Sequence, residues 1–145
     1  MKDALRLLFV CYGNICRSPM AAGIAESLLA NAVIIDSAGT NPKGNSPTEE
    51  AVQVMKNLYH VDISSHTPKP VSEANPLQFD FIIAMDSSVY AQLKAKMQIP
   101  EEKLYGWDIE DPLGLGIKAY EATAKKIQKR LEQFLINREI ERKFD

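Results

Sequence analysis

The chain has 145 residues, of which 46% are hydrophobic and 25% charged, and its formal net charge is −2 at pH 7. A chain of this length can fill one hydrophobic core but is too short for two ordinary domains, so residues 1–145 are expected to form a single domain. The nearly balanced charge provides no basic field, which excludes non-specific nucleic-acid binding and requires any anion site to be local.

The longest apolar run near the N-terminus, residues 4–11, is interrupted by Arg6 and lacks a small-residue cleavage pattern. We therefore expect neither a signal peptide nor a membrane span, no membrane partner, and a cytoplasmic location. In a reducing compartment the two cysteines are more often reactive or buried than joined in a structural disulfide. Two cysteines and two histidines are too few for a zinc site of normal spacing, so neither a metal nor a cofactor is expected.

In chain order, short apolar runs alternate with helical patterns. Residues 7–10, 33–35 and 79–84 have the continuous apolar character of strands covered on both faces, and residues 104–105 form a weaker candidate. Between the strands, helices are expected from Ser18 to about residue 31, from Ser46 through Leu58, and from about residues 86–88. A fourth helix is expected from residue 117 through Phe134, followed by a charged helical tail over residues 135–145.

The expected helix starts follow from capping chemistry. Ser18-Pro19 and Ser46-Pro47 each match an N-cap followed by the first helical position, and Glu49 stands at the capping-box position of the second helix. Alternation of strand and helix predicts an α/β fold: a four-stranded parallel sheet with helices on both faces. A loop between the first strand and the first helix then lies at the carboxyl edge of the sheet, where ligands bind in such folds.

Both cysteines lie in that loop, within the sequence VCYGNICRSP at residues 10–19. A helix N-terminus presents free backbone N–H groups, and Gly13 is expected to allow the tight backbone that aims them inward. Arg17 offers a planar pair of donors that matches two oxygens of a phosphate. The loop therefore predicts an anion site, and it lacks the glycine and lysine patterns of the common nucleotide-binding loops.

Cys11 is the candidate nucleophile of this loop. The donors that favour a bound phosphate also favour a thiolate, which would then point at the phosphorus. The alternative is a merely buried cysteine with Arg17 on the surface. The preceding strand, Gly13, Asn14 and the helix start favour the functional interpretation.

The ten residues closely resemble the signature loop of the low-molecular-weight protein tyrosine phosphatases. The resemblance covers most of the chain, continuing in residues 36–40, around His66, and in residues 84–86 and 109–112; only the tail after about Phe134 extends beyond the usual family end. It implies that Cys11 attacks the phosphoryl group and that Asp111 protonates the leaving oxygen and later activates water. The implied phosphate-binding residues are Tyr12, Gly13, Asn14, Ile15, Cys16, Arg17 and Ser18.

Asp111 also has a purely structural interpretation, because Asp-Pro often begins a turn. Phosphoryl transfer from a poor leaving group nevertheless needs an acid beside the electrostatic cradle, which favours the acid role. The resemblance also implies that a polar network of Ser18, Ser37 and His66 holds Asn14 in a strained turn. His66 could instead be an ordinary loop histidine, and a helix N-cap would fully explain Asp86.

The substrate pocket departs from the family pattern. Leu-Gly-Leu-Gly follows Pro112 where many relatives carry an aromatic wall, and residues 41–45 contain no aromatic residue. Tyr12 can compensate in part by stacking on an aryl ring. The pocket is expected to be formed by Tyr12, Ile15 and Leu113.

The predicted function is hydrolysis of phosphotyrosine in protein substrates through a cysteinyl-phosphate, with inorganic phosphate and other oxyanions as competitive inhibitors. The alternative is a phosphoarginine phosphatase, although such relatives usually carry Thr where Ile15 stands. Arsenate reductases of this fold use further cysteines downstream, whereas this chain has none after Cys16. A catalytically silent phosphate-binding module is the remaining alternative.

The sequence leaves two interpretations open for Cys16 and two for the charged tail. Cys16 is either a partner for a protective disulfide with Cys11 or a small apolar packing residue. In the tail, Ile140 and Phe144 at helical spacing either dock a partner or belong to a solvated helix end with local ion pairs.

Overall fold

A computed structural model describes residues 4–29 and 33–143, with side chains in the last helix up to residue 137. Its sheet has the four strands β1 (Leu5–Cys11), β2 (Val33–Gly39), β3 (Phe81–Ala84) and β4 (Leu104–Gly106) in the order β2-β1-β3-β4. All three strand pairs are parallel, and Cys11 is in register with Gly39. The predicted four-stranded parallel sheet is confirmed.

Because β2 and β3 flank β1 on opposite sides, the strand order reverses at β1. Parallel strands also end at one edge, so Cys11, Gly39 and Ala84 lie together at the carboxyl edge of the sheet. The loop that follows β1 therefore occupies the topological switch point, which is the usual ligand site of an open α/β sheet.

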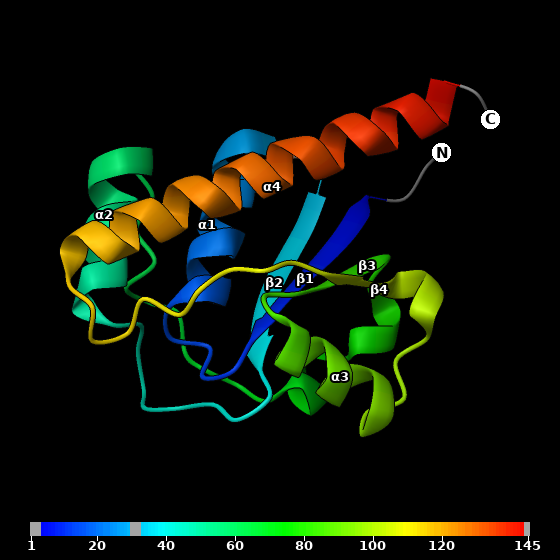
Figure 1. Cartoon of the computed structure of the whole chain (residues 1–145), viewed down its shortest axis with the longest axis horizontal. Coiled ribbons are helices and arrows are strands. Elements are labelled where there is room, and N and C mark those ends of the chain that lie inside the picture. The colour runs from blue at the N-terminus through cyan, green and yellow to red at the C-terminus, as the bar shows by residue number, and fades with distance from the viewer. Residues whose placement is uncertain (1–3, 30–32, 144–145) are drawn as a thin grey trace.

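The helices are α1 (Arg17–Leu29), α2 (Glu49–Tyr59), α3 (Ser87–Ala95) and α4 (Ile117–Lys143), with short 3-10 turns at Val71–Ala74, Pro76–Gln78 and Glu101–Lys103. Figure 1 shows α1, α2 and α4 on one face of the sheet and α3 on the other, as the prediction of helices on both faces requires. None of the helices among the described residues is both long and apolar enough to span a membrane.

The core follows from the alternation of side chains along β1. Leu7, Phe9 and Cys11 are buried in a cluster with α1, α2 and α4, whereas Leu8 and Val10 are buried in a second cluster with α3. Successive side chains of a strand point to opposite faces, so a continuous apolar run fits a strand that is covered on both sides.

Two predicted helix starts were wrong. Helix α1 begins at Arg17, so Ser18 lies inside the helix rather than at its N-cap. Helix α2 begins at Glu49 with Thr48 as the N-cap, whose hydroxyl accepts a hydrogen bond from the Ala51 N–H at 3.3 Å. The Thr48 N–H also donates to Ile15 O at 3.0 Å, which positions this segment beside the loop.

The remaining expected bounds differ only at their ends. Phe79 and Asp80 precede β3, which begins at Phe81, and Asp80 is tied to β1 through hydrogen bonds with the Arg6 backbone. Asp86 is the N-cap of α3, as anticipated. The prediction for Ile140 and Phe144 lies outside the described side chains.

Candidate active site

The loop between β1 and α1 bends back over the end of β1. Its turn is made by Asn14 in the left-handed conformation, with φ 57°, as the family resemblance implies, and Gly13 does not have a positive φ. Asn tolerates positive φ better than most residues. This turn brings the Asn14 N–H to 3.2 Å from Cys11 Sγ, so a main-chain donor faces the sulfur.

Asn14 is completely buried and held from four sides. Its Nδ2 donates to Ser18 Oγ at 2.8 Å and to Ser37 Oγ at 3.1 Å, while its Oδ1 accepts from the Lys69 N–H at 3.0 Å. His66 Nε2 lies 3.0 Å from Asn14 O and must carry the proton, because a carbonyl only accepts. These contacts stabilise a backbone conformation that a non-glycine residue adopts at a cost.

Burial lowers the pKa of His66 below its usual value, although the hydrogen bond to Asn14 O opposes that shift. The ring is therefore neutral at neutral pH. The network predicted from the family resemblance, Asn14 with Ser18, Ser37 and His66, is brought together in space, and the backbone N–H of Lys69 is an addition that sequence reasoning did not find.

Ser18 connects this network to the sulfur. Its Oγ already accepts from Asn14 Nδ2, so its own proton is free to be donated. Two acceptors are near: Cys11 Sγ at 2.9 Å and Ala38 O at 3.4 Å. The shorter contact favours donation to sulfur, which would stabilise a thiolate both before attack and as a leaving group.

The loop between β1 and α1 packs closely against Gly39 at the end of β2. A Cβ at Gly39 would lie 2.7 Å from Tyr12 O and 3.0 Å from Asn14 Cβ, so only glycine allows this close approach. Beyond it the chain runs beside the loop, with Thr40 N donating to Cys11 O at 3.0 Å and Asn41 N to Tyr12 O at 2.8 Å. Gly39, the last residue of β2, was not predicted as a site residue; its place within residues 36–40, which share the family resemblance, was the available signal.

Arg17 is 4% exposed and lies at the base of the site. Its Nη1 donates to Asp86 Oδ2 at 2.7 Å and to Ile109 O at 2.9 Å. Within the described part of the chain, its Nε and Nη2 groups make no hydrogen bond. The guanidinium is thus oriented through one nitrogen and retains donors for an oxyanion.

Asp86 both caps α3 and orients Arg17. Its Oδ1 accepts from Val89 N at 2.8 Å, while its Oδ2 pairs with Arg17. Burial alone would raise the pKa of Asp86, but the hydrogen bonds from Val89 N and Arg17 outweigh it and hold that pKa below its usual value. The N-cap explanation was therefore correct but incomplete, because the Arg17 partner was missed.

A cavity of about 260 Å³ opens above Cys11. Its lining residues come from the loop and from two other segments: Cys11, Tyr12, Gly13, Ile15, Cys16, Arg17, Lys43, Asp111 and Leu113. Asp111 is exposed at this cavity and accepts a hydrogen bond from Leu113 N at 3.1 Å. The candidate nucleophile Cys11, Arg17 and the candidate acid Asp111 therefore share one cavity with the predicted pocket residues.

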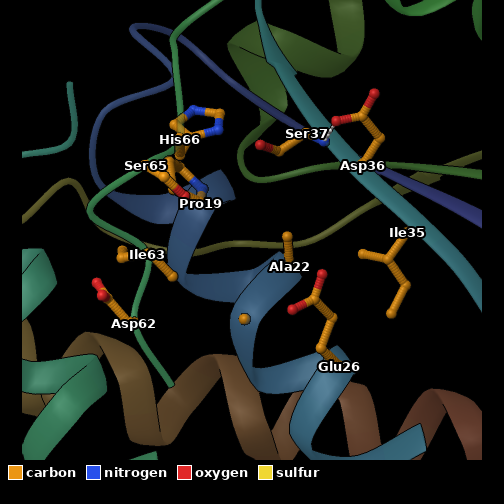
Figure 2. A pocket seen from close by; sticks show the side chains of 11 residues that line it. Pro19, Ala22, Glu26, Ile35, Asp36, Ser37, Asp62, Ile63, Ser65 and His66 are labelled. Carbon is orange, nitrogen blue, oxygen red and sulfur yellow. Dashed lines mark hydrogen bonds between the residues drawn. The ribbon is translucent and has the colours of Figure 1, made fainter. Parts of the chain in front are cut away.

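A second cavity, of about 200 Å³, lies behind the loop and is shown in Figure 2. Glu26, Asp36 and Asp62 line it from a helix, a strand and a loop, so its charge opposes binding of a phosphate dianion. Ser37 and His66 belong to its wall and contact Asn14 on their other side.

No group of three or more candidate metal-binding side chains occurs among the described residues.

Cys16 is buried and free, as is Cys11. Its Sγ lies 3.2 Å from Tyr120 Oη and 3.7 Å from Thr48 Oγ1. Burial raises the pKa of the Cys16 thiol, with the Tyr120 hydrogen bond acting against it. Cys16 is thus packed as a neutral thiol between the loop and α4, and Tyr120 is a contact that sequence reasoning missed.

The fold and this loop define an α/β protein that gathers a cysteine, an arginine and an inward main-chain donor at the switch point of a parallel sheet. The family model for low molecular weight phosphotyrosine protein phosphatase matches residues 6–145. The chain belongs to that family.

Similar proteins differ in their described activities. A solved low molecular weight protein tyrosine phosphatase from T. tengcongensis is 32% identical, with a TM-score of 0.84, covering 92% of this chain and 99% of that one. The YwlE arginine phosphatase from Geobacillus stearothermophilus is 27% identical, with a TM-score of 0.81, covering 94% and 96%. Arsenate reductase 1 of Staphylococcus haemolyticus is 30% identical over 132 residues, 91% of this chain and 96% of that protein.

Proposed function

We propose that this protein hydrolyses phosphotyrosine in protein substrates through a cysteinyl-phosphate, in the reducing cytoplasm. The observation that carries the proposal is the pair of donors at the sulfur: Asn14 N–H at 3.2 Å and Ser18 Oγ at 2.9 Å. These donors stabilise negative charge on Cys11, which lines one cavity with Arg17 and Asp111.

In the first step the Cys11 thiolate attacks phosphorus, while Arg17 and the loop amides bind the non-bridging oxygens. An S–P bond forms, the bond from phosphorus to the phenol oxygen breaks, and Asp111 gives its proton to that oxygen. In the second step Asp111 takes a proton from water, the water oxygen attacks phosphorus, and the S–P bond breaks. Ser18 donates to the departing thiolate, and inorganic phosphate leaves.

The apolar part of the cavity favours an aryl group. Tyr12, Ile15 and Leu113 line it, and Tyr12 is 45% exposed, so its ring is available for stacking. Phosphoarginine is the second candidate because an arginine phosphatase is among the similar structures. Ile15 favours a flat apolar ring over a guanidinium, which needs polar partners.

The test compares kcat/KM for phosphotyrosine, phosphoserine and phosphoarginine peptides, with Cys11→Ser as the control. We expect phosphotyrosine to be the best substrate and Cys11→Ser to release no phosphate. A preference for phosphoserine or phosphoarginine would contradict the assignment. Because arsenate reductases are among the relatives, a parallel assay with arsenate and a dithiol is included, in which we expect no steady reduction.

A further inference from the structure

Lys43 lies beside the loop between β1 and α1, although no motif in the sequence indicates a role for it there. Its backbone N–H donates to Gly13 O at 3.0 Å. Its Cγ lies only 3.3 Å from the position that a Cβ on Gly13 would occupy, so its stem rests on the loop. Its Nζ lies 5.7 Å from the centre of the Tyr12 ring, within the range of a cation–π contact.

Tyr12 is held by the same segment. Asn41 Nδ2 donates to Tyr12 Oη at 2.6 Å, and Asn41 N donates to Tyr12 O at 2.8 Å. Residues 41–43 therefore orient both the aromatic ring and the ammonium group at the mouth of the cavity. Residues 41–45 contain no aromatic side chain of their own, but this segment fixes the Tyr12 ring of the loop.

The two cationic side chains that line the cavity lie at different depths. Arg17 is buried and paired with Asp86, so it serves the phosphoryl group at the base. Lys43 is exposed, and across the described residues no carboxylate lies within 4.0 Å of its Nζ. Its charge is therefore available to a bound molecule that extends out of the cavity.

We propose that Lys43 is a specificity-determining residue that selects phosphotyrosine peptides with an acidic residue next to the phosphotyrosine. This inference rests on the proposed function. When the phosphoryl group sits on Cys11 and the ring packs against Tyr12, the flanking peptide passes over the rim that carries Lys43. A carboxylate there gains an ion pair, whereas a lysine or arginine is repelled.

The expected effect is modest because the pair is exposed. Surface ion pairs correspond to a factor of about two to five in binding, and salt screens them. Wild-type protein should thus prefer an aspartate-flanked peptide over an alanine-flanked one about threefold in kcat/KM at low ionic strength. A lysine-flanked peptide should be the poorest of the three, and the differences should shrink on addition of salt.

The experiment measures kcat/KM for three phosphotyrosine peptides that differ only in flanking residues: aspartate, alanine or lysine. The variants are Lys43→Met, which keeps the stem, and Lys43→Glu. Lys96→Glu is the matched control, because it makes the same charge change at the far end of α3 from Asp86. The readout is the ratio between peptides, which is independent of folding yield and of the overall rate.

We expect Lys43→Met to remove the preference for aspartate, Lys43→Glu to reverse the order in favour of lysine, and Lys96→Glu to leave the wild-type ratios. Unchanged ratios in both Lys43 variants would overturn the proposal, as would an equal shift in Lys96→Glu. If wild type hydrolyses the phosphotyrosine peptides without any charge preference, only this inference fails. If it hydrolyses phosphoarginine peptides instead, the proposed function itself fails.

Discussion

The Arg17–Asp86 pair offers a quantitative test, because Asp86→Asn removes the charge while retaining a good N-cap for α3. Side-chain exposure is 5% for Arg17 and 31% for Asp86. Exposed pairs contribute up to about 1 kcal/mol, and breaking a fully buried pair costs about 3–5 kcal/mol. The burial of this pair is intermediate between these two cases, so we expect Asp86→Asn to lower the free energy of unfolding by about 2 kcal/mol.

For a chain of this size, that loss lowers Tm by about 6 °C, measured by calorimetry at pH 7. The pKa of Asp86 in the folded protein is held below its usual value. The pair therefore contributes its full stabilisation above about pH 4, and this contribution is lost as the pH falls through the folded pKa. The gap in Tm between wild type and Asp86→Asn should therefore narrow in acid.

Catalysis should respond as well, because Arg17 is oriented by Asp86 and by Ile109 O. Loss of one of these two contacts should lower kcat/KM for an aryl phosphate about tenfold or more. Glu101→Gln is the control, because it breaks the more exposed pair with Lys94 and should leave both Tm and kcat/KM as in wild type. An Asp86→Asn protein with wild-type Tm and wild-type kcat/KM would refute the reasoning.

Three further substitutions test separate parts of the site. Gly39→Ala places a methyl group 2.7 Å from Tyr12 O, so denaturant unfolding should show a loss of about 1–3 kcal/mol together with reduced kcat/KM. In wild type, the His66 ring has a lower pKa in the folded than in the unfolded protein, so stability is lost as the pH falls from about 7 to about 5. His66→Gln should therefore show a smaller decline of Tm over this range. Parallel Tm-against-pH curves for wild type and His66→Gln would contradict this. Ser18→Ala should slow hydrolysis of the phosphoenzyme, seen in stopped flow as a larger burst of phenol before a slower steady rate; an unchanged burst and rate would argue against thiolate stabilisation.

The part of the site that is local in sequence was predictable. Residues 10–19 contain the end of a strand, the loop and a helix start, so their order alone placed Cys11 at the carboxyl edge of the sheet. Fold class followed from the same alternation, because each strand run and each helical pattern is strong enough to be recognised separately.

Contacts between distant segments were not predictable in this way. Arg17 meets Asp86 across 69 positions, and Cys16 meets Tyr120 across 104. Ser18 looked like an N-cap because its residue type suits that position, but the contacts with Cys11 and Asn14 place it inside α1. Capping propensity is a local preference, and a buried polar network outweighs it.

The central claim is that phosphate passes through the sulfur of Cys11, and trapping the intermediate tests it most directly. Asp111→Ala protein is mixed with p-nitrophenyl phosphate, whose phenolate leaves without a proton from an acid, quenched within the first turnover, and digested for mass spectrometry. The account predicts one phosphoryl group on the peptide that contains Cys11, and none in a Cys11→Ala, Asp111→Ala control. Phosphate release at a steady rate with no phosphoryl group on Cys11 would contradict it.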